Sequence, residues 1–208
     1  MTASSLTLYF APGTCALATR IALLEAQAEH TLVTLDFAAQ QQRSPEYLAI
    51  NPKGRVPALV TEHGVLTETC ALLLYVAQRF PVANLAPLDD PFALARMQEL
   101  NSYLASTVHV AHAHGRRGNR WADAPESIAD MQRKVPQTMA ESFEDIENYY
   151  LRDSGPWVLG NRYSVADPYL FTLARWLRSD SVDIAQFPRV AAHQARMLER
   201  AAVQKALG

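Results

Sequence analysis

The chain has only two cysteines in 208 residues, Cys15 and Cys70. Two cysteines cannot build the disulfide framework that holds many secreted proteins together, so we expect a reducing, cytoplasmic compartment. Long apolar runs are also missing: a segment such as ALLLYVA falls well short of the roughly 20 residues that span a bilayer. The first residues, MTASSLTLYFAPGT, lack the basic start and apolar stretch of a signal peptide, and we expect none.

An excess of one charge is absent as well. The chain has 19 Lys and Arg residues against 21 Asp and Glu residues, a formal net charge of -2. This balance favours neither nucleic acid nor an anionic membrane surface as a partner. Apolar residues, by contrast, are abundant, with 49% of the chain hydrophobic and 19% charged. This composition and length suit one or two globular domains with a sizeable core.

Patterns typical of strands and helices alternate along the first part of the chain, in the order β-α-β-α-β-β-α. This order predicts a small mixed α/β domain over residues 1–80. The predicted elements are a strand over residues 6–10, a helix from 17 to 28, a strand over 30–37, a short helix over 44–50, two strands over 56–62 and 63–68 that turn at His63-Gly64, and a helix from Thr69 to 80.

The pattern changes after Phe80. Residues 81–91, PVANLAPLDDP, are rich in proline and lack periodicity, so we predict a linker. Beyond the linker we find only helical spacing, which predicts an all-α domain over residues 92–208. Its helices are predicted over residues 94–111 and 139–150, after the capping box Ser164-Val-Ala-Asp167, and from Pro188 onward.

Cys15 follows the Pro12-Gly13 turn, at the point where the first helix begins. The first N–H groups of a helix have no partner within the helix, and with the helix dipole they favour a negative charge. We therefore expect a lowered pKa for the Cys15 thiol, or a place that holds a thiolate supplied by a ligand. The alternative is that Cys15 is a small buried apolar residue.

Two further segments are suited to binding a peptide. A cis bond at Val56-Pro57 would turn the backbone of Val56 outward, free to pair with an extended peptide. Thr69 is a good helix cap, and Glu68 beside it can take an ammonium group while the helix end takes a carboxylate. The alternatives are an ordinary proline at the start of a strand and a solvated glutamate beside a cap.

Together these segments resemble the glutathione S-transferase family. The resemblance is carried by APGTCALATRIALLEA, INPKGRVPALV, LTETCALLLYVAQRFP and WVLGNRYSVADPYLF, which are spread over nearly the whole chain. The chain looks most like the bacterial beta-like class, which has a cysteine where many relatives have tyrosine or serine. The resemblance implies a thioredoxin-like N-terminal domain plus an all-α C-terminal domain, a homodimer, and an active site in the cleft between the domains.

The resemblance also implies roles for single residues. Cys15 would lie at the sulfur of glutathione, either as a hydrogen-bond partner or in a mixed disulfide. Val56, with Pro57 cis, would pair its backbone with the cysteinyl unit, and Glu68 and Thr69 would hold the γ-glutamyl end.

Other positions match the family less directly. Lys53, in the segment NPKG, could reach the tripeptide or be a loop charge. His109 matches a histidine that faces the cleft in the beta-like class. Ser164 and Asp167 match a capping box of the C-terminal domain, whose role is in folding.

The chain departs from the beta-like pattern at several polar positions. Val110 stands where a lysine usually follows the histidine, and Ser102 and Thr107 replace an Asn and a Glu that serve the neighbouring subunit's glutathione. The loop AAQQQRS has no lysine. Each charge-assisted bond contributes ~1.5–3 kcal/mol, so the loss of two would weaken glutathione binding more than about tenfold.

The segment VHVAHAHGRRGNRWADAP is predicted to line the far side of the cleft. His109, His112 and His114 do not share one helical face, and we expect no metal there. We expect His109 to face the cleft, with His112 as a second candidate to face it, and His114 to lie near the helix end, where a cation is tolerated. Three arginines follow, at positions 116, 117 and 120, which either bind an anionic co-substrate or form a solvated loop; we expect the loop.

Three more residues have two interpretations each. Tyr103 and Trp121 form either an aromatic wall of the cleft or part of the core. Cys70 is expected to be a small buried residue at a domain or subunit interface, although a transient disulfide with Cys15 would need a suitable Cβ separation.

The function that these features predict is that of a glutathione-dependent enzyme, with glutathione as co-substrate. The thiolate would attack an electrophilic carbon, or thiol–disulfide exchange would follow. The alternative is a non-catalytic binding or stress-associated protein that has kept the fold. A thioredoxin-type dithiol cycle is not expected, because PGTC lacks the second cysteine of C-x-x-C.

Overall fold

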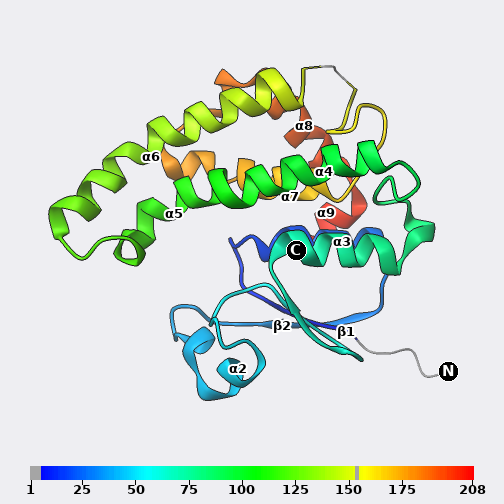
Figure 1. Cartoon of the computed structure of the whole chain (residues 1–208), viewed down its shortest axis with the longest axis horizontal. Helices are drawn as coiled ribbons and strands as arrows, with labels where there is room; N and C mark the ends of the chain where they lie inside the picture. The colour runs from blue at the N-terminus through cyan, green and yellow to red at the C-terminus, as the bar shows by residue number, and fades with distance from the viewer. Residues whose placement is uncertain (1–5, 153–154) are drawn as a thin grey trace.

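A four-stranded mixed sheet forms the base of the molecule in the computed structural model, which describes residues 6–152 and 155–208 (Figure 1). The strands lie in the order β2-β1-β3-β4; β2 runs parallel to β1, and β3 and β4 are antiparallel additions. Alternate residues of β1 are buried, as its pattern predicted. The strands are β1 (Leu6–Phe10), β2 (His30–Thr34), β3 (Ala58–Thr61) and β4 (Gly64–Thr67).

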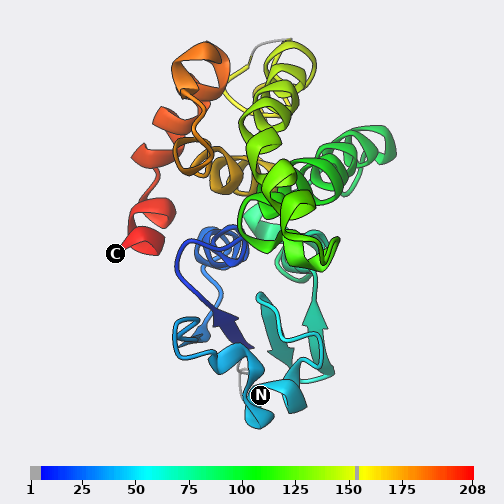
Figure 2. The same cartoon turned by 90° about the vertical axis from the view of Figure 1, so that its left-hand side faces the viewer.

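Three helices accompany the sheet (Figure 2). Helices α1 (Ala16–Glu25) and α3 (Thr69–Arg79) pack together on one face, and α2 (Pro45–Ile50) lies on the other. This β-α-β-α-β-β-α order is the one predicted, and it is the thioredoxin-like arrangement. The predicted first domain begins in residues 1–5, which lie outside the described residues.

Several boundaries differ from the prediction: α1 ends at Glu25 instead of residue 28, β3 covers Ala58–Thr61 instead of residues 56–62, and the helix predicted from residue 139 begins at Pro125. Two further differences have a local cause. The second strand ends at Thr34 instead of residue 37, because the Asp36 carboxylate accepts hydrogen bonds from the N–H groups of Ala38 and Ala39 and closes a turn. The hairpin turns at Glu62 and His63, one residue earlier than predicted, so that Gly64 already pairs with Thr61.

The described part of the second domain is helical, apart from two isolated β-bridges, Trp157–Gly160 and Leu159–Arg162, in the segment before Ala166. Helix α4 (Pro91–Tyr103) continues through a π-helical segment, Leu104–Val108, into α5 (His109–Arg117). Helix α6 (Pro125–Asp145) contains Pro136 and ends in a second π-helical segment, Ile146–Tyr150. The remaining helices are α7 (Ala166–Ala174), α8 (Pro188–Glu199) and α9 (Ala201–Leu207), with short 3₁₀ turns at Gln41–Arg43, Pro81–Ala83, Gly118–Arg120, Leu177–Asp180 and Ile184–Gln186.

The two domains share a packed interface. Helix α1 contacts α7 and α9, and α3 contacts α4, so α1 and α3 lie between the sheet and the helical domain (Figures 1 and 2). One continuous buried cluster runs from β1 through α1 into α7. The start of α1, which carries Cys15, is therefore held rigidly against the second domain.

The capping box before α7 is present. The buried carboxylate of Asp167 accepts hydrogen bonds from the backbone N–H of Ser164 at 2.8 Å and of Val158 at 2.9 Å. His193 Nε2 lies 3.0 Å from Asp167 Oδ1, the oxygen that also accepts from Val158. This network fixes the start of α7, the helix against which α1 packs. No helix of the described residues is both long and apolar enough to cross a membrane.

Candidate functional site

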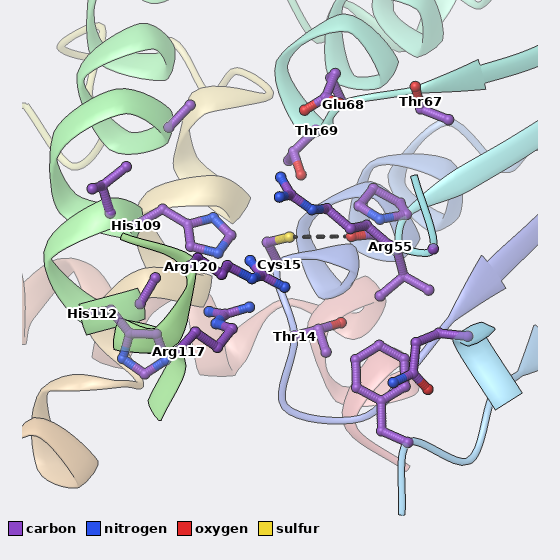
Figure 3. A pocket seen from close by; sticks show the side chains of 18 of the residues that line it. Thr14, Cys15, Arg55, Thr67, Glu68, Thr69, His109, His112, Arg117 and Arg120 are labelled. Atoms are coloured by element: carbon purple, nitrogen blue, oxygen red, sulfur yellow. Dashed lines mark hydrogen bonds between the residues drawn. The ribbon is translucent and has the colours of Figure 1, made fainter. Parts of the chain in front are cut away.

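A cavity of about 600 Å³ opens between the two domains (Figure 3). On the side of the first domain it is bounded by the loop before α1, the loop before β3 and the start of α3. On the other side it is bounded by α5 and the turn after it, with Trp176 also exposed to it. The predicted site residues that line it are Cys15, Val56, Pro57, Glu68, Thr69 and His109.

Cys15 lies at the N-cap position of α1, as the Pro12-Gly13 turn predicted. Gly13 has a φ of 73°, a left-handed conformation that glycine adopts without strain. The turn directs the Cys15 side chain into the cavity, where its thiol donates a hydrogen bond to the Val56 carbonyl at an Sγ–O distance of 3.6 Å (Figure 3).

The predicted lowering of the Cys15 pKa is wrong. Burial raises the pKa of this thiol above the ordinary value, because the side chain is enclosed and its thiolate would lose most of its hydration. The hydroxyl of Thr69 and the charge of Arg117 act in the opposite direction but do not outweigh burial. At neutral pH Cys15 is therefore mainly a thiol, able to donate a hydrogen bond to an anion beside it.

The Val56–Pro57 peptide bond is cis, as predicted. The preceding carbonyl, that of Arg55, accepts hydrogen bonds from the Tyr47 hydroxyl at 2.6 Å and from Asn51 Nδ2 at 2.7 Å, which anchor the loop. The N–H of Val56 donates to no other group of the described residues. A donor at the edge of a cavity is available to a ligand.

The cap of α3 is not where the sequence predicts it. Glu68 occupies the N-cap position with a φ of 71°, Thr69 is already the first helical residue, and no side chain of residues 6–152 or 155–208 caps the helix end. Because the backbone turns sharply at Glu68, the Thr69 hydroxyl is brought close to the Cys15 thiol, whose pKa it lowers. The first N–H groups of α3 remain open toward the cavity.

Lys53 lies beside Glu68 rather than in the cavity wall. Its Nζ donates to Thr67 Oγ1 at 2.6 Å and to Glu68 Oε1 at 2.5 Å. The side chains of Lys53 and Glu68 are 46% and 67% exposed. Lys53 therefore orients the Glu68 carboxylate, and exposure keeps the energy of this ion pair small.

His109 opens α5 and faces the cavity, with its ring edge-on to Trp176 at a centroid distance of 5.0 Å. Burial lowers the pKa of His109 to about 3, and the charges of Arg117, His112, Arg120 and Arg55 act in the same direction. Its imidazole is therefore neutral at physiological pH, which suits it to hydrogen bonding and not to carrying a positive charge.

Trp176 is a member of the site that sequence reasoning missed. Its indole Nε1 donates to the Gly13 carbonyl at 3.1 Å, across the domain interface. His112 stacks on its ring at 4.1 Å and places Nδ1 2.7 Å from the Asp180 carboxylate. No motif marks Trp176, because it reaches the site only through packing of the 3₁₀ turn after α7. His114 instead lies edge-on to Trp121.

The expectation of a solvated arginine loop holds in part: Arg116 and Arg120 are exposed, but Arg116 and Arg117 belong to α5 and not to a loop. All three line the cavity, and Figure 3 shows Arg117 and Arg120 there. Burial lowers the pKa of Arg117, which is only partly exposed. Arg43 and Arg55, from the first domain, line the same cavity and had no signal in the sequence.

The remaining candidates divide between wall and core. Trp121 lines the cavity and is 49% exposed, whereas Tyr103 donates its hydroxyl to Asp145 at 2.9 Å, away from it. Cys70 also lines the cavity, but its thiol donates to the Asn101 carbonyl at 3.2 Å, between α3 and α4, and burial raises its pKa to about 11. Within the described residues, no three or more His, Cys, Asp or Glu side chains are grouped so that they could hold a metal ion.

Comparison with known proteins identifies the families and relatives that this chain resembles. Two family models match the chain, "Glutathione S-transferase, N-terminal domain" over residues 4–78 and "Glutathione S-transferase, C-terminal domain" over residues 120–207. The glutathione S-transferase GstA of Escherichia coli O157:H7 is 32% identical, over 96% of each chain. Glutathione S-transferase GST-4.5 of Xanthomonas campestris is 30% identical, also over 96% of each chain.

Solved structures are similar over almost the whole chain. A glutathione transferase homologue from Sulfitobacter, with bound glutathione, is 50% identical and superimposes with a TM-score of 0.94, over 98% of this chain and 97% of that one. A bacterial beta class glutathione S-transferase from Sphingomonas chungbukensis is 30% identical with a TM-score of 0.83, over 97% and 96% of the two chains.

Proposed function

This chain belongs to the glutathione S-transferase family, and from that premise we propose that its cavity binds glutathione and transfers the glutathione thiolate to an electrophile. The observation that carries the proposal is the place of Cys15, whose thiol faces the cavity from the start of α1. The cysteine and His109 together favour the beta-like class within the family.

Glutathione fits the wall formed by the first domain. Its sulfur would lie between the Cys15 thiol and the start of α1, where both a hydrogen-bond donor and the helix dipole favour a thiolate. The free N–H of Val56, oriented by Pro57, would pair with the cysteinyl unit. Glu68 would take the γ-glutamyl ammonium group and the open N–H groups at Thr69 its carboxylate, with Lys53 holding Glu68 in place.

The raised pKa of Cys15 favours conjugation over thiol–disulfide exchange. Exchange needs a cysteine thiolate as nucleophile, whereas conjugation needs only that the Cys15 thiol donate a hydrogen bond to the sulfur of glutathione. In conjugation this sulfur forms a bond to an electrophilic carbon, the leaving group departs with its electron pair, and the thiol proton passes to solvent. Neutral His109 would position the reacting groups by hydrogen bonding. Homodimerisation and a cytoplasmic location stay predictions.

The test is calorimetric titration of the reduced protein with glutathione, together with conjugation of 1-chloro-2,4-dinitrobenzene. We expect binding and turnover in the wild type. In Cys15→Ala the loss of one charge-assisted hydrogen bond should lower kcat/KM about tenfold or more. Cys70→Ala, which removes the other thiol, is the matched control and should retain activity.

Two outcomes would count against the proposal. Absence of glutathione binding would leave the chain as a fold reused for another purpose. Binding without turnover of any electrophile would favour the non-catalytic alternative, in which the chain holds glutathione as a ligand only.

A further inference from the structure

The cavity carries an unusual excess of positive charge. Five guanidinium groups line it, and Glu68, its one acidic lining residue among those described, is already paired with Lys53. Across residues 6–152 and 155–208, no carboxylate lies within ion-pair distance of any of the five. They belong to Arg43, Arg55, Arg116, Arg117 and Arg120.

These cations lie close enough to affect one another. After burial, the charge of Arg55 contributes to the lowered pKa of Arg117, and Arg117 and Arg55 contribute to that of Arg120. Arg117 is partly buried and the other four are exposed around the mouth of the cavity, so an anion bound among them would be attracted by all five charges. The positive electrostatic potential of the cavity therefore favours the binding of an anion.

Glutathione accounts for only part of this charge. In the binding mode proposed above, its γ-glutamyl carboxylate lies at the start of α3 and its thiolate beside Cys15. Only the glycyl carboxylate is left for the guanidinium groups. One carboxylate can be held by one or two arginines, so the others remain available to a second anion.

The free arginines lie on the wall where a second substrate would enter. Arg117 and Arg120 come from the end of α5 and the turn after it, across the cavity from Thr67, Glu68 and Thr69 (Figure 3). The charge of Arg117 is near enough to lower the pKa of the Cys15 thiol. On the same side, Trp121 is 49% exposed and offers aromatic surface, whereas Trp176 is largely covered by His112. An anchor for an anion and a surface for an apolar body thus adjoin the sulfur site.

We propose that the second substrate is an electrophile that carries a carboxylate, which Arg117 and Arg120 bind while its body lies against the aromatic surface. The planar fork of a guanidinium group matches a carboxylate through two parallel hydrogen bonds. This inference rests on the proposed glutathione conjugation and adds the charge of the co-substrate. The glutathione sulfur bonds to the electrophilic carbon, the bond to the leaving group breaks, and the carboxylate stays unchanged as a handle.

The test compares two electrophiles of similar shape that differ in the charge of one substituent, 4-chloro-3,5-dinitrobenzoate and its neutral carboxamide. Each rate is divided by the uncatalysed rate with free glutathione, which removes the difference in intrinsic reactivity. We expect the wild type to prefer the benzoate. In Arg117→Gln the ratio of kcat/KM for the two substrates should fall about tenfold, and further in the double variant with Arg120→Gln.

The ratio is the informative quantity, because any effect of Arg117 on the sulfur acts on both substrates equally. Arg133→Gln is the matched control: it removes the same charge from an exposed position on α6 outside the cavity, and should leave the ratio unchanged. Added salt should lower the preference of the wild type, since partly exposed charges are screened.

Glutathione titration of the same proteins separates the possible failures. If the ratio stays constant while glutathione binding weakens about tenfold in Arg117→Gln, the arginines hold the glycyl carboxylate and the inference is overturned. If no electrophile is turned over, titration with the two conjugates decides instead, and equal affinities overturn the inference. If the wild type does not bind glutathione, the proposed function falls, and this inference with it.

Discussion

The protonation state of Cys15 decides which chemistry the site can perform, and it can be measured directly. The thiol is only 7% exposed and its pKa lies above the ordinary value of 9.0. At pH 7 only a small fraction of the free enzyme would then carry a Cys15 thiolate, because each pH unit below the pKa lowers that fraction about tenfold. A cysteine activated by its helix end, as the sequence suggests, would instead be largely ionised near neutral pH.

The assay follows alkylation of Cys15 by iodoacetamide as a function of pH, in a Cys70→Ala background so that a single thiol reacts. Intact mass gives the rate, and the same protein unfolded in urea gives the reference rate for an exposed thiol. We expect the rate of the folded protein to rise with pH without a plateau up to about pH 9. Replacing Arg117 by Gln should move the curve to higher pH, because its positive charge lowers the pKa of Cys15. A plateau at or below about pH 8 would refute the reasoning, since the helix end would then outweigh burial and Cys15 would be a ready nucleophile.

Three more predictions follow from the site and its support. Asp167→Ala should lower the free energy of unfolding, measured by urea titration, by about 3–5 kcal/mol, because it leaves buried hydrogen-bond donors without an acceptor. Ser164→Ala should lower it by only about 1 kcal/mol, and equal losses in the two variants would contradict the central role of Asp167. The imidazole NMR signals of His109 should not titrate between about pH 5 and pH 8, because its pKa is about 3, and a midpoint near pH 6 would disprove its burial beside the arginines. Lys53→Met should weaken glutathione binding by less than about tenfold in calorimetry, because it frees the exposed Glu68 side chain without removing it; a larger loss would mean that Lys53 touches glutathione itself.

The architecture could be predicted from the sequence because its signals are local. The alternation of residues 6–10, the Pro12-Gly13 turn and the Ser164–Asp167 box each act within a few residues, and each forms as predicted. The error at Thr69 is also local but subtler. The one-residue shift of the cap depends on the positive φ of Glu68. A non-glycine residue rarely adopts this conformation, and no residue pattern in the sequence predicts it.

The chemistry of the cavity could not be predicted in the same way, because it depends on groups that meet only in the folded chain. Position at a helix end suggested a lowered pKa for Cys15, but the opposing burial comes from the packing of α7 and α3 around it. Arg55 and Arg117 belong to different domains, so the sequence does not show that both add positive charge to the same cavity. Trp176 likewise reaches the loop at Gly13 from far along the chain.

The π-helical segment Leu104–Val108 sets the rotational phase of everything that follows it on the same helix. Each residue of an α-helix turns the chain by about 100°, and a π turn takes up one more residue over nearly the same rotation, so α5 leaves this segment in phase with α4. Loss of one residue within Leu104–Val108, with return to regular α-helix, would therefore keep His109 and His112 facing Trp176. Loss of one residue from the regular turns of α5, between His112 and Arg117, would instead turn Arg117 by about 100°, away from the cavity. Tolerance to a change of length thus differs within one continuous helix: the wide turn can absorb it, and the regular turns that carry the second wall of the cavity cannot.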